Sequence, residues 1–191
     1  MKILLLASYK GLDNLGPNYK KIYDYVIELG NTPVDNEMVS LSYDDFVKKM
    51  DTDPDASANN YKLKMKQIQA ADVCIFEVSN HSLGVGFMIE RSIQLNKPTI
   101  VLYYKQNKPY FISGVEDDKL ILKSYNDKNL KKIVKDTLEL AKERRDKRFN
   151  FFLSPKLLEY LERASSREGV TKSKLIRDMI VRHMRDNVDG A

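Results

Sequence analysis

The stretch AADVCIFEVSNHSLGVGFMIERSIQLNKPTIVLYY, from Ala70 to Tyr104, decides the fold of this 191-residue chain. Two apolar runs, at 72–78 and 98–104, flank a polar loop and a segment with helical spacing. Continuous apolar runs of this length are typical of parallel strands that are buried on both faces. A strand, a helix and a second strand in succession therefore predict one unit of a parallel α/β sheet.

The same alternation continues on both sides of this unit. Further strands are expected at 2–8, 33–34 and 119–125, and helices at 16–30, 43–50, 60–70 and from about 127 onward. Strands that alternate with helices predict an α/β fold, in which a parallel sheet carries helices on both faces. Ligands bind such sheets beyond the carboxyl ends of the strands, where the loops after Leu6 and Val78 are expected to meet.

The pattern changes near residue 147, where a smaller module begins. A strand is expected at 148–154, followed by two helices that Ser154 and Thr171 would cap and that Gly169 would separate. One strand and two helices are too few to enclose a core, so we expect a second copy of the chain to complete it. The predicted organisation is a domain at 1–146 and a module at 147–191.

Charge divides the chain at the same place. The net charge is +5, and residues 147–191, with ten Lys or Arg and six Asp or Glu, carry +4 of it. A basic segment favours an acidic partner without requiring one. The smaller module therefore carries the basic character.

Cysteine content and hydropathy bear on the compartment. Cys74 is the only cysteine and lies in an apolar run, so no disulfide can form within the chain and a reducing compartment fits. No apolar run approaches the ~20 residues that a membrane span needs. We expect a cytoplasmic protein with no membrane partner.

The segment KRFNFFLSPKLLEYLERASSREGVTKSKLIRDMI, at 147–180, combines an alternating strand, a Ser-Pro helix start, a Gly break and a Thr-x-Ser helix start. In this combination, residues 147 to about 187 resemble the ribbon-helix-helix family of DNA-binding proteins. Strands from two chains of that family pair into a ribbon that enters the major groove. The resemblance implies DNA as a partner and a homodimer or higher homo-oligomer.

Strand alternation selects the candidate DNA-contacting residues. If the other strand side chains face the core, the outward residues are Arg148, Asn150 and Phe152. Arg is suited to guanine and Asn to adenine. The second helix would bind a phosphate at its start, which comprises Thr171, Lys172 and Ser173. Backbone N–H groups and the Lys172 ammonium would make the contacts.

Phe152 departs from the pattern of the family, which usually has a polar or basic residue there. Its ring could contact a thymine methyl group. The alternative is a ribbon that no longer reads DNA and serves only for dimerisation.

The blocks LLLASYKG, at 4–11, and AADVCIFEVSNHSLGVGFMIERSIQLNKPTIVLYY carry a second resemblance. In these blocks, the first 145 or so residues resemble the nucleoside 2-deoxyribosyltransferase family, most closely its branch of deoxynucleoside 5′-monophosphate N-glycosidases. The segment 31–60 matches poorly. The resemblance implies a flavodoxin-like fold and a pocket for a nucleoside or nucleotide.

Ser82, Gly84 and Gly86 are expected just before a helix, where free N–H groups and the helix dipole favour a phosphate. The resemblance implies that Ser82 contacts the 5′-phosphate and that Ser8 and Lys10 contribute from the loop after the first strand. The alternative is a strand-to-helix turn that binds no ligand.

The catalytic positions of the family differ in this chain. The nucleophilic Glu that follows Gly-Val-Gly-x in the family corresponds to Met88, and an Asp eight residues before Asp72 corresponds to Lys64. A thioether cannot attack an anomeric carbon as a carboxylate does. Glu90 lies roughly 200° further around the helix and is not expected to replace it. We expect Met88 to line the pocket and Lys64 to attract an anion there.

The first hypothesis is a DNA-binding regulator whose N-terminal domain binds a nucleotide-like ligand without cleaving it. No cofactor and no metal are expected. The alternative is an active nucleotide N-glycosidase or deoxyribosyltransferase that uses other residues, in which the module at 147–191 serves only for oligomerisation. A third hypothesis is an assembly protein whose pocket is empty.

Overall fold

The computed structural model describes residues 1–145 and 151–188. The chain divides into two compact units, Met1–Arg145 and Asp146–Ala191. Among the described residues, no helix combines the length and the apolar character needed to cross a membrane.

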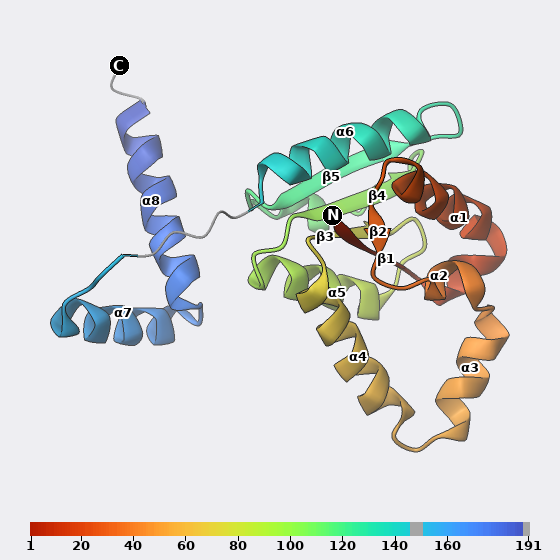
Figure 1. Ribbon diagram of the computed structural model, residues 1–191, viewed down its shortest axis with the longest axis horizontal. Helices are drawn as coiled ribbons and strands as arrows, with labels where there is room; N and C mark the ends of the chain where they lie inside the picture. Colours follow the sequence, from red (N-terminus) through yellow and green to blue (C-terminus); the bar gives the residue numbers. More distant parts are fainter. Residues whose placement is uncertain (146–150, 189–191) are drawn as a thin grey trace. The chain divides into compact units, whose positions relative to one another are not determined.

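The first unit is built on a parallel sheet (Figure 1). Its strands are β1 (Lys2–Ala7), β2 (Thr32–Pro33), β3 (Val73–Glu77), β4 (Thr99–Tyr104) and β5 (Leu120–Tyr125). They lie in the order β2-β1-β3-β4-β5, and every neighbouring pair is parallel. This is the flavodoxin-like order, in which the winding direction reverses between β1 and β3. The predicted α/β class is confirmed.

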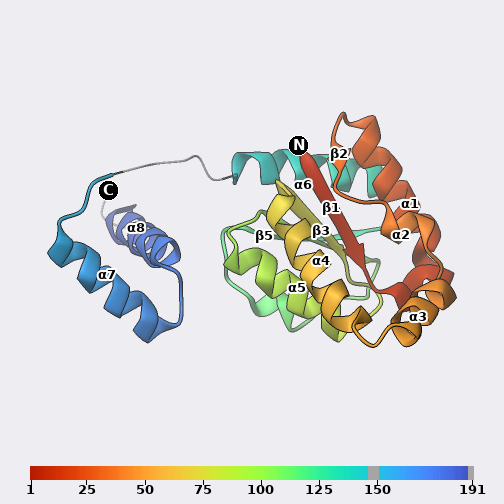
Figure 2. The same cartoon turned by 60° about the horizontal axis from the view of Figure 1, so that its bottom comes forward.

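Helices cover both faces of the sheet (Figures 1 and 2). One face carries α1 (Leu12–Glu28) and α6 (Leu130–Glu143), and the other carries α4 (Ala56–Ala70) and α5 (Leu83–Gln94). Two shorter helices, α2 (Glu37–Ser40) and α3 (Tyr43–Thr52), lie between β2 and α4. Short 3-10 turns occur at Tyr9–Gly11 (η1) and Ile112–Gly114 (η2).

Alternate residues of each central strand enter two separate apolar cores. Ile3, Leu5 and Ile75 pack toward α1 and α6. Leu4, Leu6 and Phe76 pack toward α4 and α5, together with the buried Cys74. Because both faces of β1 and β3 are covered, these strands read in the sequence as unbroken apolar runs.

Several helices begin earlier than the sequence indicates. Helix α1 begins at Leu12 rather than near Gly16, and Pro17 is accommodated inside it. Helix α5 begins at Leu83, because Ser82 is its N-cap and accepts a hydrogen bond from the Val85 N–H at 3.4 Å. Gly84 and Gly86 therefore lie in the first turns of α5 rather than before it, which corrects the expectation. Helix α2 was not predicted.

The second unit contains α7 (Pro155–Glu168) and α8 (Lys172–Val188). Ser154 caps α7, and Gly169 ends it in the left-handed region with φ 65°, where a side chain would be strained. The Thr171 hydroxyl accepts a hydrogen bond from the Lys174 N–H at 3.1 Å, as expected of an N-cap.

The expected strand at 148–154 falls partly outside the described residues, since the structure describes only 151–154 of it. These four residues have no regular secondary structure. A strand needs a neighbour for its backbone N–H and C=O groups. In the expected ribbon that neighbour belongs to a second chain, so whether the ribbon forms stays a prediction.

A buried carboxylate joins three strands at the carboxyl end of the sheet. Glu77 is inaccessible to solvent and accepts hydrogen bonds from the Ser79 hydroxyl, the Ser79 N–H at 3.3 Å and the Tyr125 hydroxyl at 3.0 Å. The Ser79 hydroxyl oxygen in turn accepts from the Tyr104 N–H at 2.6 Å. Burial raises the pKa of Glu77, although the hydrogen bonds from Ser79 and Tyr125 oppose that rise.

The pKa of Glu77 predicts a pH-dependent stability. Because the folded state holds this proton more tightly than the unfolded chain, the contribution of Glu77 is greatest below the unfolded pKa of ~4.3. That contribution is lost as pH rises through the raised folded pKa. In urea unfolding across this window, wild type is expected to lose stability relative to Glu77→Gln, which does not titrate. A difference between the two proteins that stays constant with pH would contradict this expectation.

Candidate functional site

A pocket of about 420 Å³ lies at the carboxyl end of the sheet. The ends of β1 and β3, where the strand order reverses, supply two of its sides, and this is where doubly wound sheets bind ligands. Helices α3 and α4 supply the others. The lining residues are Ala7, Ser8, Tyr9, Lys10, Tyr43, Phe46, Val47, Asn60, His81, Ser82, Leu83, Gly84, Val85 and Met88.

One side of the pocket favours an anion. The first turn of α5 begins there, and its leading N–H groups have no acceptor within the helix and carry the positive end of its dipole. Lys10 and His81 lie in the same lining. Within Met1–Arg145, the residues that line this pocket include no Asp or Glu. The N-terminus of α5 and the Lys10 ammonium on this side both favour a negatively charged ligand.

On the anion side of the pocket, the turn after β1 packs closely against neighbouring side chains at Gly11, in η1. A Cβ atom on Gly11 would lie 2.2 Å from the Tyr19 hydroxyl and 3.2 Å from Cβ of Asn80. Glycine therefore lets the turn after β1 pack against the loop after β3. This contact brings Ser8 and Lys10 to the same pocket as Ser82.

The other side of the pocket is flat and apolar. The rings of Tyr9 and Phe46 stack with their centroids 3.8 Å apart and their planes within 8°. Tyr43, Val47 and Met88 extend this surface. Aromatic faces of this kind suit a planar ring.

Met88 lies in the lining and also packs against the core between the sheet and α4–α5. The next acid along α5, Glu90, is exposed, accepts a hydrogen bond from the Gln94 amide at 2.9 Å and does not line the pocket. Helix α5 therefore offers a thioether, and no carboxylate, to a bound ligand.

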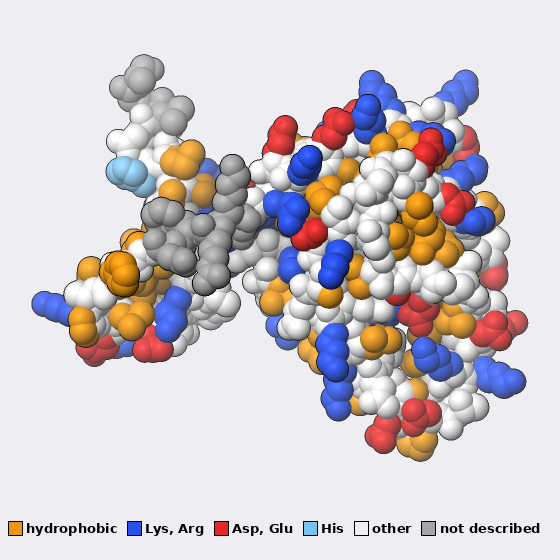
Figure 3. All heavy atoms as spheres, viewed as in Figure 1, with side chains coloured by type: hydrophobic (Ala, Val, Ile, Leu, Met, Phe, Trp, Pro, Cys, Tyr) orange, Lys and Arg blue, Asp and Glu red, His pale blue; other side chains and the backbone are white. Residues whose placement is uncertain are grey.

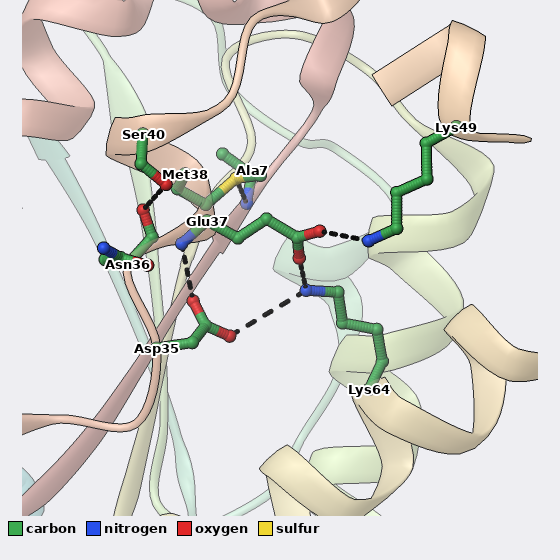
Figure 4. Close-up of polar contacts among 8 residues, drawn as sticks. All are labelled: Ala7, Asp35, Asn36, Glu37, Met38, Ser40, Lys49 and Lys64. Atoms are coloured by element: carbon green, nitrogen blue, oxygen red, sulfur yellow. Dashed lines mark hydrogen bonds and ion pairs between the residues drawn. The ribbon is translucent and has the colours of Figure 1, made fainter. Parts of the chain in front are cut away.

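Lys64 does not line the pocket. Its buried ammonium hydrogen-bonds to Glu37 and lies 3.9 Å from Asp35 (Figure 4). Glu37 also pairs with Lys49 at 3.4 Å. The charge of Lys64 is thus balanced within the protein, so the expected attraction for a ligand is replaced by a structural ion pair. Gly86, which was also expected to bind the ligand, likewise lies outside the lining of the pocket.

The carboxylates of these ion pairs also act on Tyr9, which with Phe46 forms the aromatic wall of the pocket. Burial would raise the pKa of Glu37, but the hydrogen bond and charge of Lys64 lower it, so this carboxylate stays ionised. Burial raises the pKa of Asp35 despite the charge of Lys64. Burial and the neighbouring Glu37 raise the pKa of Tyr9, which keeps its hydroxyl protonated.

Helix α2 holds these carboxylates in place. The buried Met38 accepts a hydrogen bond from the Ala7 N–H through its sulfur at 3.2 Å, which fixes α2 against the end of β1 (Figure 4). Asp35 caps the turn by accepting from the Glu37 N–H at 3.1 Å. Beyond the presence of acids in a polar segment, no sequence pattern indicated this role.

The candidate DNA-contacting residues belong to the second unit. Arg148 and Asn150 lie outside the described residues, and the Phe152 side chain is fully exposed. Thr171, Lys172 and Ser173 are exposed together at the start of α8. There, Lys172 forms a surface ion pair with Glu162 at 3.1 Å.

The second unit buries little of its apolar surface. Its core consists of Leu161, Ala164 and Leu175, with Leu153, Val170 and Ile176 packed against them. Large apolar side chains remain exposed around it (Figure 3): Phe151, Phe152, Leu157, Leu158, Tyr160, Met179, Ile180 and Met184. Such a surface exceeds what a small monomeric unit normally leaves in water.

No protein-family model matches the chain, and no curated protein matches it. Among solved structures, it is similar to the CMP N-glycosidase of Clostridium botulinum, with a TM-score of 0.44 and 17% sequence identity. The similarity covers 71% of this chain and 97% of that one. It is a distant likeness.

Among the described residues, no cluster of His, Cys, Asp and Glu could hold a metal ion.

The ion pairs of Lys64 predict unequal effects for two lysine substitutions. Lys64→Met removes a side chain that is only 4% exposed. It leaves Glu37 and Asp35, which are each 15% exposed, without this positively charged partner. Breaking a buried pair is expected to cost about 3–5 kcal/mol of unfolding free energy. The control, Lys49→Met, removes a partner of Glu37 that is 53% exposed and should cost about 0–1 kcal/mol. Urea unfolding of both variants tests this, and equal losses would contradict it.

Proposed function

We propose that the protein is a DNA-binding regulator whose first unit binds a nucleotide-like anion without cleaving it. The observation that supports this most strongly is the composition of the pocket. A helix N-terminus, Lys10 and His81 line one side, stacked aromatic rings line another, and Met88 takes the position of the nucleophile in the family that the sequence resembles.

The two sides of the pocket match the two parts of a nucleotide. A phosphate would accept hydrogen bonds from the N–H groups at the start of α5 and from the Ser82 and Ser8 hydroxyls, with Lys10 nearby. The sugar and base would extend toward Met88 and the aromatic wall. Gly84 leaves room for a close approach to the backbone, since it carries no side chain.

Cleavage of such a ligand needs groups that the pocket lacks. Retaining glycosidases use one carboxylate as nucleophile and a second group as acid and base. Met88 supplies neither, and Lys64 is held in ion pairs with Glu37 and Asp35. An enzyme would have to recruit Glu37, whose carboxylate already binds Lys49 and Lys64. Binding without cleavage is therefore the better-supported function.

The second unit supports the DNA-binding part of the proposal through its charge and its unfinished core. It carries +4 of the net charge of +5, and the exposed start of α8 offers Thr171, Lys172 and Ser173 to a phosphate. Pairing with a second copy would cover the exposed apolar side chains and form the ribbon. Arg148 and Asn150 would then read base edges, with Phe152 beside them.

Ligand would regulate DNA binding only if it prefers one arrangement of the dimer. Equal affinity for two arrangements shifts nothing, however tight the binding. By thermodynamic linkage, DNA would then change the affinity for ligand by the same factor. Ligand affinity measured with and without DNA therefore reports the coupling.

The anion side of the pocket predicts a preference for phosphorylated ligands. Deoxynucleoside monophosphates are expected to bind more tightly than the matching nucleosides in calorimetric titrations, with no release of free base. Lys10→Ala should weaken monophosphate binding about tenfold or more, because a hydrogen bond to a charged group contributes about 1.5–3 kcal/mol. Lys20→Ala, a surface lysine of α1 that pairs with Asp24, is the control.

Equal binding of monophosphates and nucleosides would contradict the proposed anion site. Release of free base by the wild-type protein would favour the alternative, an active N-glycosidase or deoxyribosyltransferase. The calorimetric titrations read the first result, and chromatography of the titrated mixture reads the second.

The basic charge of the second unit predicts salt-dependent DNA binding. Fluorescence anisotropy with a duplex from the protein's own promoter region should give an affinity that falls linearly with salt on logarithmic axes. Lys172→Ala should weaken binding and reduce the salt slope by about one per chain. Lys156→Ala, an exposed lysine at the start of α7, is the matched control. Absence of binding at low salt, or a flat salt response, would defeat the proposal.

A further inference from the structure

The lining of the pocket contains two buried polar atoms without a hydrogen-bond partner in the described part of the chain, the Tyr9 hydroxyl and the side-chain oxygen of Asn60. The side-chain oxygen of Asn60, on α4, is buried and accepts no hydrogen bond from any described residue. Asn60 is also part of the pocket lining. A buried acceptor left without a donor costs free energy, and native proteins rarely tolerate one unless a ligand or water satisfies it.

The neighbourhood of Asn60 indicates what kind of donor would reach it. Asn60 and Lys64 are four residues apart on α4 and share one face of the helix. Lys64 is paired with Glu37 and Asp35, whereas the side-chain oxygens of Asn60 and Gln67 have no partner among the described residues; of these two residues, Asn60 lines the pocket and Gln67 does not. The stacked rings of Tyr9 and Phe46 line the same pocket.

A planar ring stacked on an outer face of the Tyr9–Phe46 pair would present its edge within the pocket that Asn60 lines. Nucleobases stack on aromatic side chains regardless of their identity, so stacking alone does not select among them. Selection requires a hydrogen bond to the edge of the base. An exocyclic amino group donates to an amide oxygen, whereas a ring carbonyl at the same position offers only another acceptor.

We propose that Asn60 makes the pocket selective for a nucleobase that carries an exocyclic amino group, as cytosine and adenine do. This inference rests on the proposed function, because it assumes that the pocket binds a nucleotide. It adds a specificity-determining residue: the phosphate is held at the start of α5, and Asn60 distinguishes an amine from a carbonyl on the base. Uracil and hypoxanthine replace the amine with a carbonyl and are the natural comparison.

Matched ligand pairs test the selectivity. Calorimetric titration of the full chain with dCMP against dUMP, and with dAMP against deoxyinosine monophosphate, compares ligands that differ mainly by amine and carbonyl. At least one amino member is expected to bind about tenfold or more tightly than its partner, which corresponds to about 1.4 kcal/mol. Equal affinities within both pairs, or a consistent preference for the carbonyl members, would overturn the inference.

Three variants connect the selectivity to Asn60. Asn60→Leu removes the acceptor at similar size and should bring the affinity ratio close to one, while both monophosphates still bind. Asn60→Asp keeps an acceptor oxygen and should retain the preference for the amine, with weaker binding of both anions. Asn59→Leu changes the exposed neighbour on α4 and should leave the ratio unchanged. Circular dichroism confirms that each variant is folded.

The outcomes separate this inference from the proposed function. If no monophosphate binds, both fail. If monophosphates bind without selectivity, or if Asn60→Leu keeps the wild-type ratio, only the assignment to Asn60 fails and the anion site stands.

Discussion

The parallel pairing of β1 with β3 is the constraint on which the rest of the first unit depends. Their register runs from Ile3 opposite Val73 to Ala7 opposite Glu77, so both strands end at the same level. The turn after β1 and the loop after β3 therefore emerge side by side, and Gly11 allows them to touch. An apolar sequence buried on both faces creates this pairing, and the pocket is its geometric consequence.

At one of the two positions where the chain departs from the resembled catalytic pattern, Lys64, the replacement is fixed by charge. A buried ammonium at Lys64 is tolerated only because Asp35 and Glu37 face it, since an uncompensated buried charge costs several kcal/mol. Replacing Lys64 with an acid would gather three carboxylates in one place. Restoring a nucleophile at Met88 alone would leave the second catalytic role unfilled. The Lys64–Glu37 ion pair between α4 and α2 therefore occupies the position at which the resembled family has its second carboxylate.

The sequence predicted the strands well because their apolar runs have a single physical explanation, burial on both faces. The loops after β1 and β3 were predicted to meet because strand order determines where they emerge. The family resemblance pointed to Ser8, Lys10, Ser82 and Met88, and the helix start to Ser82 and Gly84; all of these residues line the pocket. The polar segment 31–60 has no such periodicity, so α2 and its carboxylates were not predicted. Burial of the Asn60 side-chain oxygen and pairing of Lys64 with carboxylates depend on tertiary contacts that no local pattern encodes.

A pocket that binds without cleaving has different requirements from an active site. An enzyme uses binding energy to stabilise a transition state, and its ligand disappears as it acts. In the proposed function, with no nucleophile at Met88, the full affinity would be directed at the ground state of the ligand, which would be released unchanged. Occupancy then follows ligand concentration reversibly, as linkage to a second binding event requires. In the function proposed above, a thioether at Met88 is therefore compatible with the aromatic rings and the anion side of the pocket, whose contacts would all serve a ligand that stays intact.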